Sequence, residues 1–93
     1  MKKIIIFYGE ECPHCHAMLP LADRLSKEEH IEVEKLEIWH NKANADKMRA
    51  HEDLIRKASG GEFGVPALLD LEEKRALVGE TTYEELKTWL KKK

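Results

Sequence analysis

The sequence predicts one α/β domain over residues 1–93, with the element order βαβαββα and a four-stranded mixed sheet that carries helices on both faces. Three observations lead to this prediction. The segment Lys3 to Tyr8 holds the longest apolar run, which is typical of a central strand covered on both sides. Segments with helical spacing alternate with strands in the first half of the chain. Two short apolar segments, separated by Glu72-Glu73, predict a hairpin near the carboxyl end.

The first half of the chain is predicted to form a strand, a helix and a second strand. After the strand Lys3 to Tyr8, Pro13 suits the first turn of a helix, where a missing N–H costs nothing. Pro20 lies inside this helix and should kink it. The second strand is predicted over Ile31 to Ile38, and Trp39-His40-Asn41 forms its exit loop. Two strands joined by a helix imply a right-handed crossover and parallel pairing.

The second half is predicted to form a helix, a hairpin and a final helix. A single helix is expected from about Ala43 to Ala58. The hairpin strands are Ala67 to Leu71 and Arg75 to Val78. Thr82 with Glu85 matches a capping box, the pattern in which two side chains satisfy the free N–H groups at a helix start. The final helix should therefore begin just after Thr82.

Composition excludes several classes of function. Sixteen basic and eighteen acidic residues give a formal net charge of -2, which argues against nucleic-acid binding. The longest apolar run is far shorter than the ~20 residues of a membrane span, so no membrane association is expected. The same segment is too short for a signal peptide and lacks a cleavage site of small residues. We therefore expect a cytoplasmic protein, and we expect it to be a monomer.

The chemistry is predicted to lie in Cys12-Pro13-His14-Cys15, which holds both cysteines of the chain. A thiolate attacks a disulfide, so one cysteine needs a lowered pKa. Cys12 lies where the free N–H groups of the first helix converge, which favours the anion, and His14 should favour it further. Cys15, one turn inward, is the expected resolving thiol. A close cysteine pair beside a βαβ pattern predicts thiol–disulfide exchange.

Three other interpretations share these residues. Cys12 to His16 formally match C-x-x-C-H, the attachment motif of c-type haem, although no export signal accompanies it. A metal-binding or metal-delivery domain could combine the same thiols with His14, His16, His40 or His51, but no second cysteine pair specifies a closed zinc site. A binding adaptor could also keep the fold without catalysis.

Taken together, the motifs resemble the thioredoxin superfamily over nearly the whole chain. Tyr8 is an aromatic residue four positions before the first cysteine, as in thioredoxins. Pro20 falls five positions after the second cysteine, where thioredoxins have a helix-kinking proline. Val65-Pro66 matches their hydrophobic-proline pair, in which the proline is cis and faces the disulfide. The Pro-His dipeptide between the cysteines is the one found in DsbA-type oxidants.

The resemblance implies roles for residues outside the cysteine motif. Pro66 would shape the substrate groove, and the backbone of Val65 would pair with a substrate strand. Trp39 would either cap the core at a strand end or contact the substrate, since sites in such sheets gather at the carboxyl ends of strands. Tyr8 would contact the substrate or pack near Cys15.

The chain also departs from the family pattern. The buried aspartate that thioredoxins place before their aromatic pair is Ile6 here, so a proton-relay carboxylate is absent, and the usual tryptophan beside the first cysteine is Glu11. Gly79-Glu80-Thr81 does not supply the glutathione site of glutaredoxins, so the sequence does not predict whether glutathione is used. The expected activity needs no bound cofactor. Its expected partners are protein or small-molecule disulfides and an upstream reductase or dithiol donor.

Overall fold

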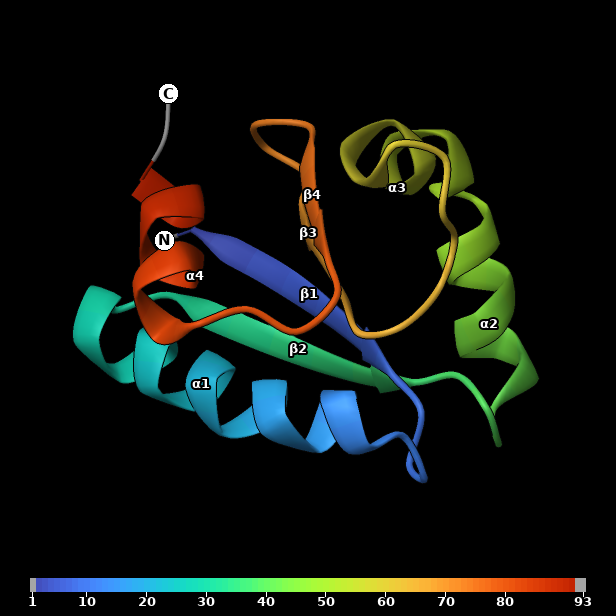
Figure 1. Ribbon diagram of the computed structural model, residues 1–93, viewed down its shortest axis with the longest axis horizontal. Helices are drawn as coiled ribbons and strands as arrows, with labels where there is room; N and C mark the ends of the chain where they lie inside the picture. The colour runs from blue at the N-terminus through green and yellow to red at the C-terminus, as the bar shows by residue number, and fades with distance from the viewer. Residues whose placement is uncertain (1, 92–93) are drawn as a thin grey trace.

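The computed structural model describes residues 2–91, and its strands form one mixed sheet (Figure 1). The strands are β1 (Lys3–Tyr8), β2 (Glu32–Glu37), β3 (Ala67–Asp70) and β4 (Arg75–Val78), in the order β2-β1-β3-β4 across the sheet. β1 pairs in parallel with β2 and antiparallel with β3, and β3 pairs antiparallel with β4. The predicted mixed sheet, with its parallel first pair and its hairpin, is confirmed.

The helices cover both faces of the sheet, as predicted. α1 (Pro13–Glu29) and α4 (Tyr83–Lys91) pack on one face, and α2 (Lys42–Arg49) and α3 (Glu52–Ser59) lie on the other (Figure 1). Each face has its own apolar cluster between helices and strands. None of the helices in the described part of the chain is both long and apolar enough to cross a membrane.

β1 is the central strand that the apolar run predicts. Ile4 and Ile6 are fully buried against the helices of the first face, because alternate side chains of a strand point to opposite sides. Ile5 and Phe7 are buried in the cluster of the other face. The strand therefore contributes side chains to both cores, and it delivers the chain to the cysteine motif at its carboxyl end.

The single helix predicted from Ala43 to Ala58 is wrong, because the chain forms two helices that meet at Ala50 and His51. The N–H of His51 bonds to the Met48 carbonyl at 3.0 Å, a tighter turn than that of an α-helix, and its backbone leaves the helical region at φ -112 and ψ 20. The charges mark this break. α2 ends with basic residues and α3 begins with acidic ones, which is the order that two separate helix dipoles favour.

The predicted start of the last helix is confirmed, and the first helix includes Pro20 as expected. α4 begins with the capping box, in which the Glu85 N–H donates to Thr82 Oγ1 at 3.1 Å and the Glu85 carboxylate accepts from the Thr82 N–H at 3.3 Å. α1 includes Pro20 and continues past it as one helix to Glu29.

A buried carboxylate lies at the end of the sheet away from the cysteines. Asp70 is the last residue of β3 and is wholly buried. Lys2 Nζ lies 2.9 Å from its carboxylate and Arg75 Nη2 lies 3.7 Å from it. Its other oxygen accepts the Glu73 N–H at 3.3 Å. The ion pairs therefore tie the amino-terminal end of β1 to the β3–β4 hairpin.

Candidate active site

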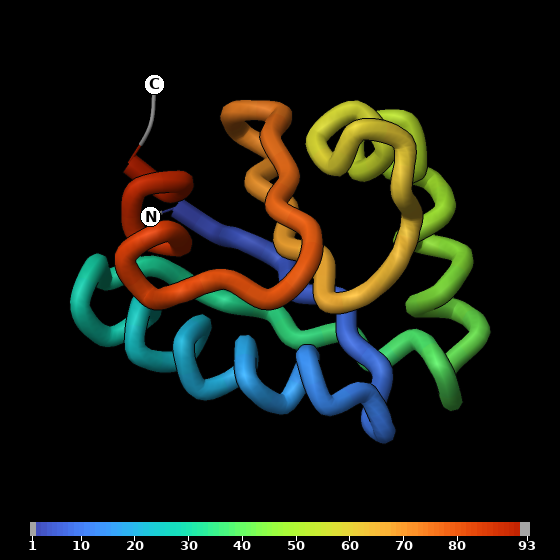
Figure 2. Tube along the Cα trace, viewed as in Figure 1, coloured from blue at the N-terminus to red at the C-terminus, as the bar shows by residue number. Residues whose placement is uncertain are grey.

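The predicted site residues lie at one end of the sheet. The chain leaves the parallel strands β1 and β2 at this end and enters β3 there, since Phe7 of β1 is paired with Ala67 of β3 (Figure 2). Cys12 follows β1, Trp39 follows β2, and Val65-Pro66 precedes β3. The topology thus places the cysteine motif and the proline segment at the same end of the sheet.

The two cysteines occupy the start of α1 in different environments. Cys12 is the residue that caps the helix, and its sulfur accepts the Cys15 N–H at 3.4 Å. Both residues are buried, but Cys12 keeps 6% exposure, whereas Cys15 has none. The cysteines are not joined in the structure. Of the two sulfurs, that of Cys12 thus belongs to the residue with some exposed surface.

The turn before the motif holds both cysteines in place. The Cys12 N–H donates to the Gly9 carbonyl at 3.0 Å, and the Gly9 N–H donates to the sulfur of Cys15 at 3.5 Å. Burial raises the pKa of the Cys15 thiol to about 12, the hydrogen bond with Cys12 acts in the same direction, and the Gly9 N–H opposes both. Cys15 is thus a protonated thiol at neutral pH.

His14 is held by a residue that the sequence did not indicate. Its Nδ1 lies 2.8 Å from the Glu80 carboxylate, which comes from the loop after β4, and its ring is exposed. Pro13 occupies the first turn of α1, as predicted. The contact fixes the ring of His14, in the first turn of α1, to the loop after β4.

A carboxylate missed by the sequence analysis joins two loops of the site. The Glu37 side chain accepts the N–H groups of Glu10 at 2.9 Å, Trp39 at 3.1 Å and His40 at 2.7 Å. Partial burial alone would raise the pKa of the Glu37 carboxyl, but these three donors together hold it below its usual value. The loop before Cys12 and the loop after β2 are therefore fixed to each other.

A second contact joins the same loops. His40 Nε2 lies 2.7 Å from the Glu11 carboxylate. The hydrogen bond to Glu11 raises the pKa of the His40 imidazole, and the negative charge of that carboxylate adds to the effect. His16 also has a partner, because its Nε2 contacts the Glu10 carbonyl. Glu11 is thus engaged by a histidine rather than free to act on the Cys12 thiol.

Trp39 does not cap the core, so that part of the prediction is wrong. Its side chain is 50% exposed and lies flat over Gly9, the residue that begins the turn from β1 toward Cys12. A Cβ atom at Gly9 would come within 2.3 Å of the indole ring. A half-exposed indole beside the cysteine loop can contact a substrate. Substrate contact, the other predicted role of Trp39, therefore stays a prediction. Tyr8 is half-buried, and its carbonyl accepts the Ile38 N–H at 2.9 Å.

The segment before β3 has the predicted cis peptide bond between Val65 and Pro66. Pro66 is buried, and its carbonyl accepts the Gly79 N–H at 2.9 Å. Within residues 2–91, the backbone groups of Val65 have no hydrogen-bond partner. These N–H and C=O groups are therefore available to an external strand at this end of the sheet.

Candidate metal ligands are grouped elsewhere in the site. Among the described residues, three donors lie within reach of one another, and these are Glu10, Glu11 and His40, all exposed. The group includes neither cysteine. The structure therefore does not bring the thiols and a histidine into one set of ligands, as the metal interpretation of the motif requires.

Comparison with solved structures identifies the fold. A thioredoxin 1 from Thermosipho africanus matches with a TM-score of 0.68 at 20% identity, over 95% of this chain and 89% of the other. A thioredoxin from Aeropyrum pernix matches with a TM-score of 0.67 at 24% identity, over 96% and 72%. A mutant thioredoxin from Halobacterium salinarum matches with a TM-score of 0.63 at 22% identity, over 94% and 69%. No protein-family model and no curated protein sequence matches the chain.

Proposed function

Since the chain has the thioredoxin fold, we propose that it is a thiol–disulfide oxidoreductase that works through Cys12 and Cys15. The observation that carries the proposal is the difference between the two thiols. Cys12 caps a helix and keeps 6% exposure, while Cys15 is fully buried with a pKa of about 12. Disulfide exchange by a dithiol needs such a division between an attacking thiol and a protected resolving thiol.

In the first step, the Cys12 thiolate attacks one sulfur of a substrate disulfide. A bond forms between Cys12 and that sulfur, the substrate disulfide breaks, and the other substrate sulfur leaves as a thiolate. The free N–H groups and the positive end of the α1 dipole stabilise the attacking anion. His14, which lies in the same helical turn and is held by Glu80, would help to stabilise this thiolate.

In the second step, Cys15 loses its proton and attacks the Cys12 sulfur. The Cys12–Cys15 disulfide forms, and the second substrate sulfur leaves as a thiolate that takes up a proton. The exchange transfers two electrons from the dithiol to the substrate. Ile6 stands where thioredoxins have a buried carboxylate, and the buried acid in the described part of the chain, Asp70, lies at the far end of the sheet. The departing substrate thiolate is therefore the proposed acceptor of the Cys15 proton.

The proposed substrate groove lies beside the cysteines. The unpaired backbone of Val65 would bond to an extended substrate segment, and Pro66 would form the floor next to it. The half-exposed ring of Trp39 would pack on the substrate from the other side, with Tyr8 at the end of β1. These contacts suit an extended polypeptide that carries a disulfide.

The proposed activity needs no bound cofactor, because electrons would arrive by thiol exchange from a reductase or another dithiol. We assign the protein to the cytoplasm, where such donors keep thiols reduced, and we expect it to act as a monomer. Its substrates would be protein or small-molecule disulfides. The reduction potential of the Cys12–Cys15 couple gives the direction of electron flow, since ~30 mV corresponds to about 1.4 kcal/mol for two electrons.

A trapping experiment tests the assigned roles. Cys15→Ser should accumulate a mixed disulfide with a disulfide-containing protein such as insulin, because the resolving thiol is gone. Cys12→Ser should form none and should lose insulin reduction. Non-reducing gels and intact-protein mass spectrometry measure both. Mixed disulfides in Cys12→Ser, or equal insulin reduction by the wild type and Cys12→Ser, would overturn the assignment of Cys12.

Metal analysis distinguishes the proposed oxidoreductase from the main alternative, a metal-delivery domain. Protein purified under reducing conditions is expected to carry no stoichiometric zinc or copper bound through the thiols. Stoichiometric metal that disappears in a Cys12→Ser/Cys15→Ser double variant would instead support metal delivery by the same cysteine pair. Among the described residues, no contact favours that function, because the grouped candidate ligands exclude both cysteines.

A further inference from the structure

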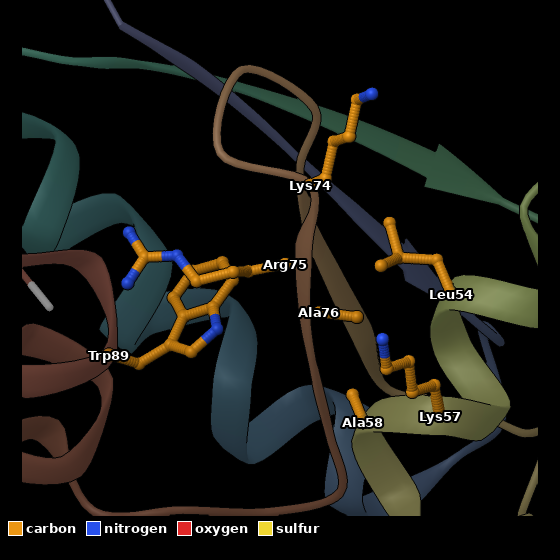
Figure 3. A pocket seen from close by; sticks show the side chains of 7 residues that line it. All are labelled: Leu54, Lys57, Ala58, Lys74, Arg75, Ala76 and Trp89. Atoms are coloured by element: carbon orange, nitrogen blue, oxygen red, sulfur yellow. The ribbon is translucent and has the colours of Figure 1, made fainter. Parts of the chain in front are cut away.

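A groove of about 400 Å³ lies along β4, away from the cysteines (Figure 3). One wall is formed by α3, from which Leu54 and Lys57 extend toward the strand. The other wall is formed on the side of α4, where the side chains of Arg75 and Trp89 lie beside each other. The backbone at Ala76 runs between them.

The floor of this groove is the free edge of the sheet. β4 is the last strand, and its other edge pairs with β3. The Gly79 N–H bonds to the Pro66 carbonyl at 2.9 Å, and hydrogen-bonded pairs in an antiparallel ladder recur at every second residue. Arg75 and Leu77 therefore bond to β3, while the N–H and C=O groups of Ala76 and Val78 point outward. These two residues offer four backbone groups to an added strand.

The two edges of the sheet are protected to different degrees. β2, at the opposite edge, consists of Glu-Val-Glu-Lys-Leu-Glu, and its charges discourage pairing with another strand. β4 consists of Arg-Ala-Leu-Val and has one charged residue, at its start. An apolar free edge between two helices is the geometry that strand addition uses.

The groove is positively charged. Its charged lining residues are Lys57, Lys74 and Arg75, and no acidic side chain lines it. Within residues 2–91, neither lysine has an ion-pair partner, and Arg75 Nη2 is 3.7 Å from Asp70. Arg75 Nε and Nη1 and the indole N–H of Trp89 are buried without an acceptor among the described residues. These donors have almost no accessible surface, so the positive charge that a ligand can reach comes mainly from the exposed Lys57 and Lys74.

We propose that the free edge of β4 binds an extended acidic segment of a partner protein by strand addition. The segment pairs with the backbone of Ala76 and Val78, and its carboxylates meet Lys57 and Lys74 of the groove. A second copy of this chain fits less well. Its own β4, placed antiparallel on this edge, would bring another Lys74 and Arg75 into a groove that already carries positive charge.

A binding experiment with the full chain tests whether the β4 edge binds an acidic strand. The probe is a fluorescein-labelled octapeptide of alternating glutamate and valine, with an octapeptide of alternating lysine and valine as the charge control. We expect binding of the acidic peptide by fluorescence anisotropy, weakened by high salt, and no binding of the basic one. On binding, hydrogen exchange at the amides of Ala76 and Val78 should slow, because these N–H groups gain acceptors.

Variants separate strand addition from simple charge attraction. Lys57→Glu/Lys74→Glu changes two exposed residues and should weaken acidic-peptide binding at least about tenfold. Lys27→Glu/Lys42→Glu, with the same net charge but outside the groove, should bind like the wild type. An octapeptide of alternating glutamate and proline keeps the charge but holds every second φ at about -65°, away from the extended strand, so it should bind much more weakly.

Several outcomes would overturn the proposal. These are equal binding of the valine and proline peptides, an equal loss in the two double variants, or unchanged exchange at Ala76 and Val78. Concentration-dependent dimers that slow exchange at the same amides without peptide would assign the edge to a second copy instead. All of these readouts are independent of the cysteines, so Cys12→Ser should bind the acidic peptide as the wild type does.

Discussion

Replacing Gly9 by alanine tests how the site loop is packed. The added Cβ would lie 2.3 Å from the Trp39 ring, and ordinary contact begins at 3.4 Å, so the ring must withdraw by about 1.1 Å. Overpacking in a well-packed region costs about 1–3 kcal/mol. Because Trp39 is half-exposed and can swing outward, we expect the lower end, about 1 kcal/mol, in the free energy of unfolding.

A double-mutant cycle identifies the cause of that loss. In a Trp39→Ala background the clash is absent, so Gly9→Ala should cost less than about 0.5 kcal/mol. Gly64→Ala is the matched control, because a Cβ there meets nothing within 4 Å. Urea denaturation of the four proteins of the cycle gives the coupling energy. Equal losses from Gly9→Ala in both backgrounds would refute the packing of Trp39 on Gly9.

Three further predictions concern single groups. The raised pKa of Cys15 gives a contribution to stability that is fully present below the thiol's ordinary pKa of 9.0 and is lost as the pH rises toward about 12. Between these pH values, urea denaturation should show that the wild type loses stability faster than Cys15→Ala. Parallel curves of stability against pH for the two proteins would contradict this prediction. Glu37→Gln should speed hydrogen exchange at the three amides that the carboxylate accepts, whereas Glu34→Gln should leave them unchanged. Thr82→Ala removes a helix cap and should lower stability by about 1 kcal/mol, while Thr88→Ala, within the same helix, should change it less in thermal denaturation.

Local patterns in the sequence predicted most of the fold. The apolar run indicated the central strand, and the Thr82–Glu85 pair indicated the start of the last helix. Each depends on neighbours within a few positions, which a sequence displays directly. The break at His51 was missed because apolar spacing continues across it, although the basic and then acidic charges on its two sides were a usable signal.

The site was predictable only in its cysteine motif and its cis proline. The partner of His14 is Glu80, 66 positions away, and the Glu37 carboxylate reaches back 27 positions to the loop before Cys12. No local pattern encodes such contacts, because they arise when the ends of separate strands meet. The contact of Trp39 was not predictable for the same reason, since its ring lies on a glycine in another loop rather than on the core.

The buried ion pair of Asp70 has a consequence for redesign. Removing one partner of a buried pair typically costs about 3–5 kcal/mol, so the stability of the fold depends strongly on this end of the sheet. β3 extends over roughly 13 Å from there to the end that meets Pro66, at about 3.3 Å per residue. Pro13 and His14 are both exposed and lie at that other end. The dipeptide between the cysteines can therefore be exchanged to alter reactivity while the anchoring charges stay intact, so chemistry and folding can be varied separately in this small chain.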